Sequence, residues 1–101
     1  MIVELNNKNF EEQTKTGLKL VEFYASWCSY CRQQRPVLEE LANNNIWIGT
    51  VDADESPEIV DKYGIDGFPS FLLFKDGKVI SALPGYHDKS QLLAGIMQNL
   101  N

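Results

Sequence analysis

The two cysteines of the chain, Cys28 and Cys31, are separated by two residues in the stretch Trp27-Cys28-Ser29-Tyr30-Cys31. This spacing suits thiol–disulfide exchange, because one thiolate can attack a substrate disulfide and the other thiol can resolve the mixed disulfide that forms. The pair follows an apolar segment and opens a predicted helix, whose N-terminal N–H groups and dipole stabilise a thiolate. We therefore expect Cys28, at an exposed tip, to be the nucleophile, and Cys31, more buried, to be the resolving thiol.

Other uses of two cysteines are less well supported by the sequence. Structural zinc and iron–sulfur sites use about four ligands, and the one histidine, His87, lies far along the chain with no visible partner. A disulfide across so short a loop would stabilise the fold little. Two cysteines also cannot build the disulfide framework of a small secreted domain. The sequence therefore favours a redox-active dithiol and predicts no metal site.

The segments on either side of the dithiol must position it. Residues 18–25 are almost continuously apolar, which is typical of a strand covered on both faces, so Glu22 within them is unexpected. A helix is predicted from the dithiol to about Ala42, with Pro36 inside it expected to cause a kink. A strand that leads directly into a helix would hold the two thiols at the helix N-terminus.

The rest of the chain continues the alternation of strands and helices. Further strands are predicted at residues 2–5, 46–52, 70–74 and 78–82, and further helices at about 7–15, 57–63 and from 89 onward. Asp76-Gly77 indicates a tight hairpin, and Asp88 with Gln91 resembles a capping box before a last helix whose apolar face reaches Leu100. Strands separated by helices are expected to pair in parallel, and the hairpin to add antiparallel strands. The order βαβαβαββα predicts an α/β fold, a mixed sheet with helices on both faces.

Length, charge and hydropathy exclude several classes of protein. With 101 residues, the chain is expected to form a single domain over residues 1–101. No apolar run approaches the roughly 20 residues of a membrane span, and a net charge of −5 argues against binding to nucleic acid or anionic membranes. The first residues lack the basic start and long apolar stretch of a secretory signal, and we expect a cytoplasmic protein. A leader that has been removed remains the alternative.

In combination, these motifs resemble the thioredoxin family. The matching segments are LVEFYASWCSYC at residues 20–31, Pro36, DESP at 54–57, KYGI at 62–65, FPS at 68–70, FKDG at 74–77 and Gly85. The resemblance covers nearly the whole chain, in the family's order and spacing. It implies the thioredoxin fold, a central mixed five-stranded sheet flanked by four helices, and thiol–disulfide oxidoreductase activity that needs no bound cofactor.

The resemblance also implies roles for residues around the dithiol. Cys28 would be the catalytic nucleophile and Cys31 the catalytic resolving thiol. Pro69 would be in cis opposite the cysteines, where it exposes the backbone of Phe68 to an extended substrate; an ordinary turn proline remains the alternative. The positions implied to contact substrates or partners are Trp27, Ser29, Tyr30, Phe68, Gly85 and Tyr86.

Glu22 occupies the position of the family's buried acid, which is usually aspartate. Burial should raise the pKa of this carboxyl, which could then take a proton from Cys31, through water, as that thiol attacks the mixed disulfide. The alternative is a glutamate at the strand edge whose long side chain reaches solvent. Thr50 stands where the family commonly places a lysine, so we expect the pKa of Glu22 to be raised further.

The residues between the cysteines depart from the family, which usually has Gly-Pro where this chain has Ser29-Tyr30. Without the proline, the backbone N–H of Tyr30 can point at the Cys28 sulfur. An additional donor would stabilise the thiolate and raise the reduction potential. The alternative is that Ser29-Tyr30 is tolerated here without a change in the potential.

The expected partners are disulfide-containing proteins and an electron donor, either a reductase of the thioredoxin-reductase type or another dithiol system. The protein is expected to act as a monomer. A more oxidising disulfide oxidase or isomerase remains an alternative. So does a partner-binding module of the same fold with little turnover.

Overall fold

The computed structural model describes residues 1–100 and has five strands and four helices. In chain order they are β1 (Ile2–Leu5), α1 (Phe10–Thr14), β2 (Leu18–Tyr24), α2 (Ser29–Asn43), β3 (Ile48–Asp52), α3 (Pro57–Tyr63), β4 (Ser70–Lys75), β5 (Lys78–Pro84) and α4 (Lys89–Gln98). The strands form one sheet in the order β1-β3-β2-β4-β5. This confirms the α/β fold with a central mixed five-stranded sheet flanked by four helices.

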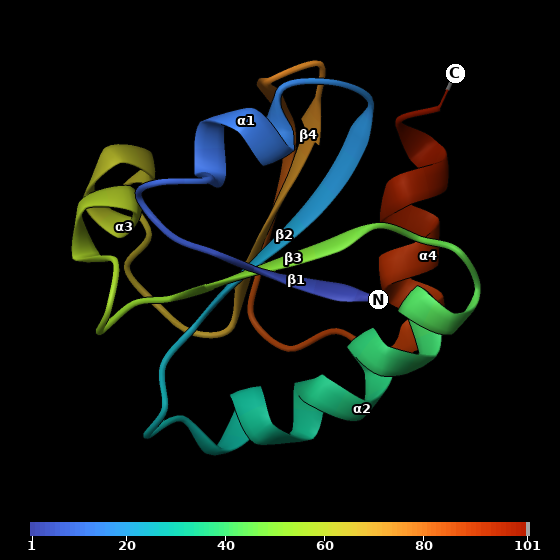
Figure 1. Ribbon diagram of the computed structural model, residues 1–101. Helices are drawn as coiled ribbons and strands as arrows, with labels where there is room; N and C mark the ends of the chain where they lie inside the picture. Colours follow the sequence, from blue (N-terminus) through green and yellow to red (C-terminus); the bar gives the residue numbers. More distant parts are fainter. Residues whose placement is uncertain (101) are drawn as a thin grey trace.

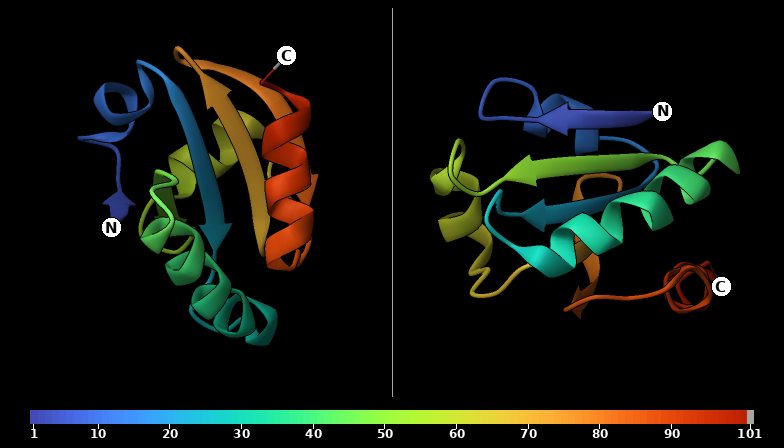
Figure 2. Two further views of the ribbon diagram at one scale, coloured as in Figure 1. Left: turned by 90° about the vertical axis from the view of Figure 1, so that its right-hand side faces the viewer. Right: turned by 90° about the horizontal axis from the view of Figure 1, so that it is seen from below.

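The helices cover both faces of the sheet, with α2 and α4 on one side and α1 and α3 on the other (Figures 1 and 2). β2 is the middle strand, so its side chains are buried in both directions. Successive residues of a strand point to opposite faces. Glu22 therefore shares the α2 face with Leu20, whereas Val21 and Phe23 belong to the core beneath α1 and α3.

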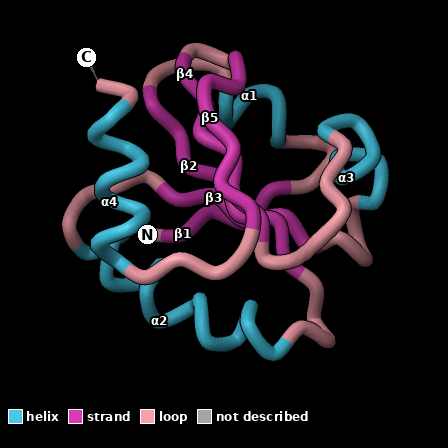
Figure 3. Tube along the Cα trace, turned by 180° about the vertical axis from the view of Figure 1, so that it is seen from behind, coloured by secondary structure: helices cyan, strands magenta, loops and turns pink. Residues whose placement is uncertain are grey.

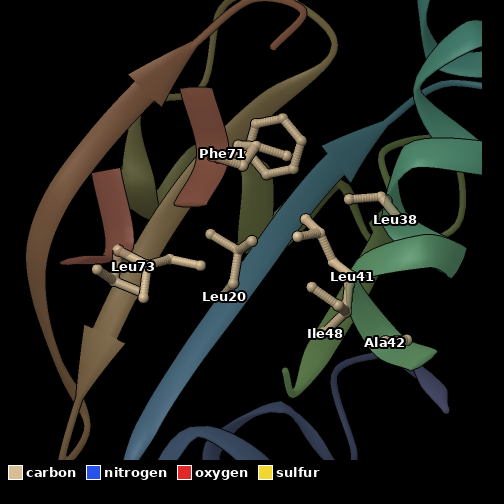
Figure 4. Packing of buried hydrophobic residues seen from close by; sticks show 9 residues of the cluster. Leu20, Leu38, Leu41, Ala42, Ile48, Phe71 and Leu73 are labelled. Atoms are coloured by element: carbon tan, nitrogen blue, oxygen red, sulfur yellow. The ribbon is translucent and has the colours of Figure 1, made fainter. Parts of the chain in front are cut away.

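The core on the α2 side holds the dithiol helix against the sheet. Leu38 and Leu41 of α2 project toward Leu20 of β2, with Ile48 of β3 and Phe71 of β4 beside them (Figure 4). All five side chains are almost completely buried. Burying a side chain of this size contributes about 1.5–3 kcal/mol, so this packing fixes α2 relative to β2.

Strand directions differ in part from expectation. β1 and β2 each pair in parallel with β3, but β4 runs antiparallel to β2, although α3 precedes it. An apolar run indicates burial without specifying direction or neighbour, so the sequence pattern could not fix the pairing of β4. The hairpin between β4 and β5 is confirmed (Figure 3). The φ angles of Asp76 and Gly77 in its turn are positive.

The helix ends follow local polar contacts. At α4, Asp88 and Gln91 form the expected capping box, whereas Leu100 lies beyond the helix and is exposed, so its assignment to the apolar face was wrong. α1 begins later than expected because Oδ1 of Asn6 accepts the backbone N–H groups of Lys8 and Asn9, which forms a turn there. Among the helices of residues 1–100, none combines the length and the apolar character that a membrane crossing requires.

Candidate functional site

The two thiols lie where the loop after β2 enters the N-terminus of α2. Cys28 is the N-cap residue of this helix, and its Sγ accepts a hydrogen bond from the backbone N–H of Cys31 at 3.2 Å. We expected the N–H of Tyr30 to point at this sulfur. The donor is instead the N–H of Cys31, the third residue of α2. This is the usual N-cap arrangement, in which the N-cap side chain accepts from the N2 or N3 position.

The exposure of the cysteines also differs from expectation. Each is 7% exposed, so Cys28 is no more exposed than Cys31. Phe68 packs against the small core cluster of Ala25, Cys28 and Cys31, and the Cys28 S–H donates to the Phe68 carbonyl at 3.5 Å. The neighbouring Trp27 and Tyr30 are 68% and 59% exposed. A partner would therefore meet these aromatic side chains before it reached the sulfur.

A second segment lies opposite the dithiol. The Phe68–Pro69 peptide bond is cis, as expected. Phe68 also meets Trp27 edge to face, with ring centroids 6.0 Å apart, and the Gly85 N–H donates to the Pro69 carbonyl at 2.9 Å. The structure therefore brings the segments around Cys28, Pro69 and Gly85 together.

Two further candidate contact residues lie on the surface near these segments. Ser29 is the first residue of α2 and is exposed, and Tyr86 follows Gly85 and is also exposed. Both side chains are thus accessible to a partner. Within residues 1–100, no group of three or more His, Cys, Asp or Glu side chains is placed to hold a metal ion.

Glu22 is buried beside the dithiol. It is 3% exposed, and its Oε2 has no hydrogen-bond partner among the described residues, which excludes the alternative of a side chain that reaches solvent. A pocket of about 200 Å³ is lined by Glu22, Tyr24, Ala25, Ser26, Cys31, Arg32 and Arg35. A pocket of this size has room for water molecules, which could link the Glu22 carboxyl to the Cys31 thiol.

The protonation of both groups is shifted in the same direction. Burial raises the pKa of Glu22 to about 8. Burial also raises the pKa of the Cys31 thiol, and the hydrogen bond with Cys28 raises it further. A buried thiol with a raised pKa needs a base to become a nucleophile, and the carboxyl that lines the same pocket can serve as that base.

A second carboxylate, that of Glu4, lies near the buried Glu22 and was not identified from the sequence. Glu4, Thr50 and Glu22 occupy matching register positions across β1, β3 and β2. Glu4 accepts hydrogen bonds from the Tyr24 hydroxyl at 3.0 Å and from the Thr50 hydroxyl at 3.3 Å. The negative charge of Glu4 raises the pKa of Glu22. Burial raises this pKa more strongly, and the positive charge of Arg35 lowers it. Only the register of three strands brings these residues together, and the sequence pattern did not supply it.

The expectation that Glu22 lacks a cation was incomplete. Arg35 of α2 lines the pocket, and its positive charge lowers the pKa of Glu22, although burial remains the dominant influence. Arg35 also pairs with Glu39, with Nε and Oε2 3.7 Å apart. Residues four apart share one helix face, so the spacing of Arg35 from Cys31 could have indicated this cation.

These opposing charges lead to a prediction about Glu22. Glu4→Gln should lower the pKa of Glu22, because it removes a negative charge, and Arg35→Met should raise it. The pKa can be followed by NMR titration of the side-chain carboxyl. Glu12→Gln, an exposed change on α1, is the control and should leave the pKa unchanged. Shifts of the same sign in the two variants would contradict the arrangement.

The chain is similar to known proteins over almost its whole length. A family model described as Thioredoxin matches residues 1–98. A thioredoxin of Listeria monocytogenes is 38% identical over 95 residues, which cover 91% of this chain and 92% of that protein. A thioredoxin of Chlamydia caviae is 37% identical over 101 residues, covering 98% and 99%. A thioredoxin of Staphylococcus haemolyticus is 37% identical over 94 residues, covering 90% of each.

Proposed function

The chain belongs to the thioredoxin family and is a thiol–disulfide oxidoreductase, and we propose that it acts as a protein-disulfide reductase through a mixed-disulfide intermediate. The observation that supports this best is the position of Cys28. Its sulfur caps α2 and lies 3.5 Å from the Phe68 carbonyl. A substrate strand paired along Phe68 would therefore place its disulfide close to this sulfur.

The proposed reaction has two exchange steps. The Cys28 thiolate attacks one sulfur of the substrate disulfide, the substrate S–S bond breaks, and the other substrate sulfur leaves as a thiolate that takes a proton from solvent. Cys31 then attacks the Cys28 sulfur and releases the second substrate thiol. Two electrons pass to the substrate, and the Cys28–Cys31 disulfide remains for a dithiol donor to reduce.

In the second step, Glu22 is the proposed base for Cys31. Both groups line one pocket, so the thiol proton can pass to the carboxylate through water. Because burial raises the pKa of Glu22 to about 8, only a minority of the carboxyl is ionised at neutral pH. The rate of this step should therefore rise with pH through about 8.

The proposed substrate surface is formed by the exposed side chains around the two segments. Trp27, Ser29, Tyr30 and Tyr86 would contact the partner, and the backbone of Phe68 and Gly85 would hold an extended chain. Exposed aromatic side chains suit such a surface, because they bury large areas with few rotatable bonds. We propose that Pro69 keeps this backbone next to the dithiol.

The proposed partners are disulfide-containing proteins and a thioredoxin-reductase-type or other dithiol donor. We further propose that the protein works in the cytoplasm as a monomer, with residues 1–101 as a single domain. Insulin reduction in the presence of a thioredoxin reductase and its nicotinamide donor tests the function directly. A partner-binding module would bind disulfide proteins without turnover in this assay.

The residues between the cysteines favour one second candidate, a more oxidising oxidase or isomerase. Tyr30 stands where the family usually has a proline, so the first turn of α2 keeps one more backbone N–H besides that of Cys31, which donates to the Cys28 sulfur. N–H groups in the first turn of a helix stabilise a neighbouring thiolate. We expect a reduction potential near −200 to −230 mV, above the thioredoxin value of about −270 mV. Redox titration against glutathione measures it, and Tyr30→Pro should lower it. A wild-type value at or below about −270 mV would contradict this expectation.

A further inference from the structure

Gln34 is a polar side chain with no exposed surface, located on α2 three residues after Cys31. Its amide makes two hydrogen bonds to the backbone of a single distant residue. Nε2 donates to the His87 carbonyl at 2.7 Å, and Oε1 accepts the His87 N–H at 3.0 Å. The dithiol helix is thereby joined to the loop between β5 and α4.

This loop continues to the segment opposite the dithiol. The ring Nδ1 of His87 lies 2.8 Å from the Gly85 carbonyl, and the Gly85 N–H donates to the Pro69 carbonyl at 2.9 Å. The His87 ring also packs edge to face on Phe71 of β4, with ring centroids 6.1 Å apart. A continuous path of contacts therefore runs from α2 through residues 85–87 to Pro69.

The side-chain amide of Gln34 pairs with the backbone N–H and carbonyl of His87, as backbone groups pair with one another in helices and strands. Buried backbone N–H and C=O groups need partners, and residues 85–87 lie outside the helices and strands. An apolar side chain at position 34 would leave the His87 N–H and carbonyl without these partners. The loop, half-buried at His87, would then lose the two hydrogen bonds that hold it to α2, and its position relative to the helix would no longer be fixed.

We propose that Gln34 is a positioning residue, which holds the Gly85–Tyr86 segment of the substrate surface at a fixed place relative to the dithiol. The proposal rests on the proposed function, because it assigns that segment to substrate binding. A polypeptide disulfide would contact the segment, whereas a small disulfide needs only the Cys28 sulfur. Gln34 would therefore favour polypeptide over small disulfides.

The test measures the first exchange step alone, in a Cys31→Ser background that stops at the mixed disulfide. Gln34→Met keeps a similar side-chain volume and removes both hydrogen bonds to His87. We expect mixed-disulfide formation with insulin to slow about tenfold, since binding must now also order the loop. The rate with 5,5′-dithiobis(2-nitrobenzoate), a small aromatic disulfide, should change less than about twofold.

Gln33→Met is the matched control, because Gln33 lies on the same helix and is exposed. It should leave both rates unchanged. If Gln34→Met does not fold, as judged by its thermal melting, Gln34→Glu keeps the shape and the acceptor for the His87 N–H but lacks the Nε2 donor. That variant should show the same preference in weaker form.

Two results would overturn the proposal. Equal slowing with both disulfides would show that Gln34 acts on the dithiol, and no slowing with insulin would show that its hydrogen bonds matter only for folding. A wild-type protein that forms mixed disulfides but does not turn over insulin would contradict the proposed function. The single-step rates would still decide the role of Gln34.

Discussion

Cys28→Ser should abolish insulin reduction, with a rate at least about a thousandfold below that of the wild-type protein. A serine hydroxyl at the N-cap of α2 is not ionised at neutral pH and cannot form a disulfide. The substitution changes one atom in a residue that is 7% exposed, so the fold should remain intact. Insulin precipitation in the presence of a dithiol reductant measures the loss.

Cys31→Ser gives the complementary result. The nucleophile remains, but the mixed disulfide cannot be resolved, so a covalent adduct between Cys28 and the substrate should accumulate. Non-reducing electrophoresis and mass spectrometry detect it. Insulin reduction that survived Cys28→Ser, or a Cys31→Ser protein that formed no adduct, would contradict the roles proposed for the two thiols.

Local sequence patterns were sufficient for the parts of the site that depend on one segment. The apolar run before the cysteines predicted a central strand, and β2 is the middle strand of the sheet. The pair after it predicted a helix N-terminus, and Cys28 caps α2. Such features follow from burial, spacing and capping, which neighbouring residues determine.

Contacts between distant segments could not be predicted in the same way. Gln34 and His87 are 53 residues apart in the chain, and nothing in the sequence around either residue indicates the other. Glu4 of β1 lies near Glu22 of β2 only because both strands pair with β3, which lies between them. Hydrophobic periodicity shows which face of an element is buried but not which element covers it.

The burial of Cys28 shows the same limit. Its place at a helix N-terminus suggested exposure, but Phe68, from a segment 40 residues away, packs over it. Trp27 and Tyr30, on either side of Cys28, remain exposed. Whether a helix end is accessible depends on tertiary neighbours that local spacing does not report.

Glu22→Gln should remove a large pH dependence of stability. The pKa of Glu22 is about 8 in the folded protein, against 4.5 for a solvated glutamate side chain such as that of the unfolded chain. Below pH 4.5 both states hold the proton. Between pH 4.5 and about 8 the unfolded chain releases it, whereas the folded protein keeps it because ionising the buried carboxyl is unfavourable. The free energy of unfolding should therefore fall over this interval by on the order of 4–5 kcal/mol, since one pKa unit corresponds to about 1.36 kcal/mol.

Glutamine at this position keeps the shape of the neutral acid and does not titrate. The variant should show a nearly constant contribution from this site between about pH 5 and 9, and should be more stable than the wild-type protein above about pH 8. Urea unfolding at a series of pH values measures the difference. Glu12→Gln, an exposed change on α1, is the control and should keep the wild-type pH dependence.

The same variant separates the structural effect of the buried acid from its proposed chemical role. If Glu22 accepts the Cys31 proton, Glu22→Gln should slow the release of the second substrate thiol from a preformed mixed disulfide by about a hundredfold. The slower rate should also lose the rise with pH through about 8 that the carboxylate gives the wild-type protein. Stopped-flow measurement of a single turnover follows this step. A variant with altered stability but an unchanged rate of release would show that Glu22 titrates within the fold without acting as the base, and the proton of Cys31 would then have to leave by another path.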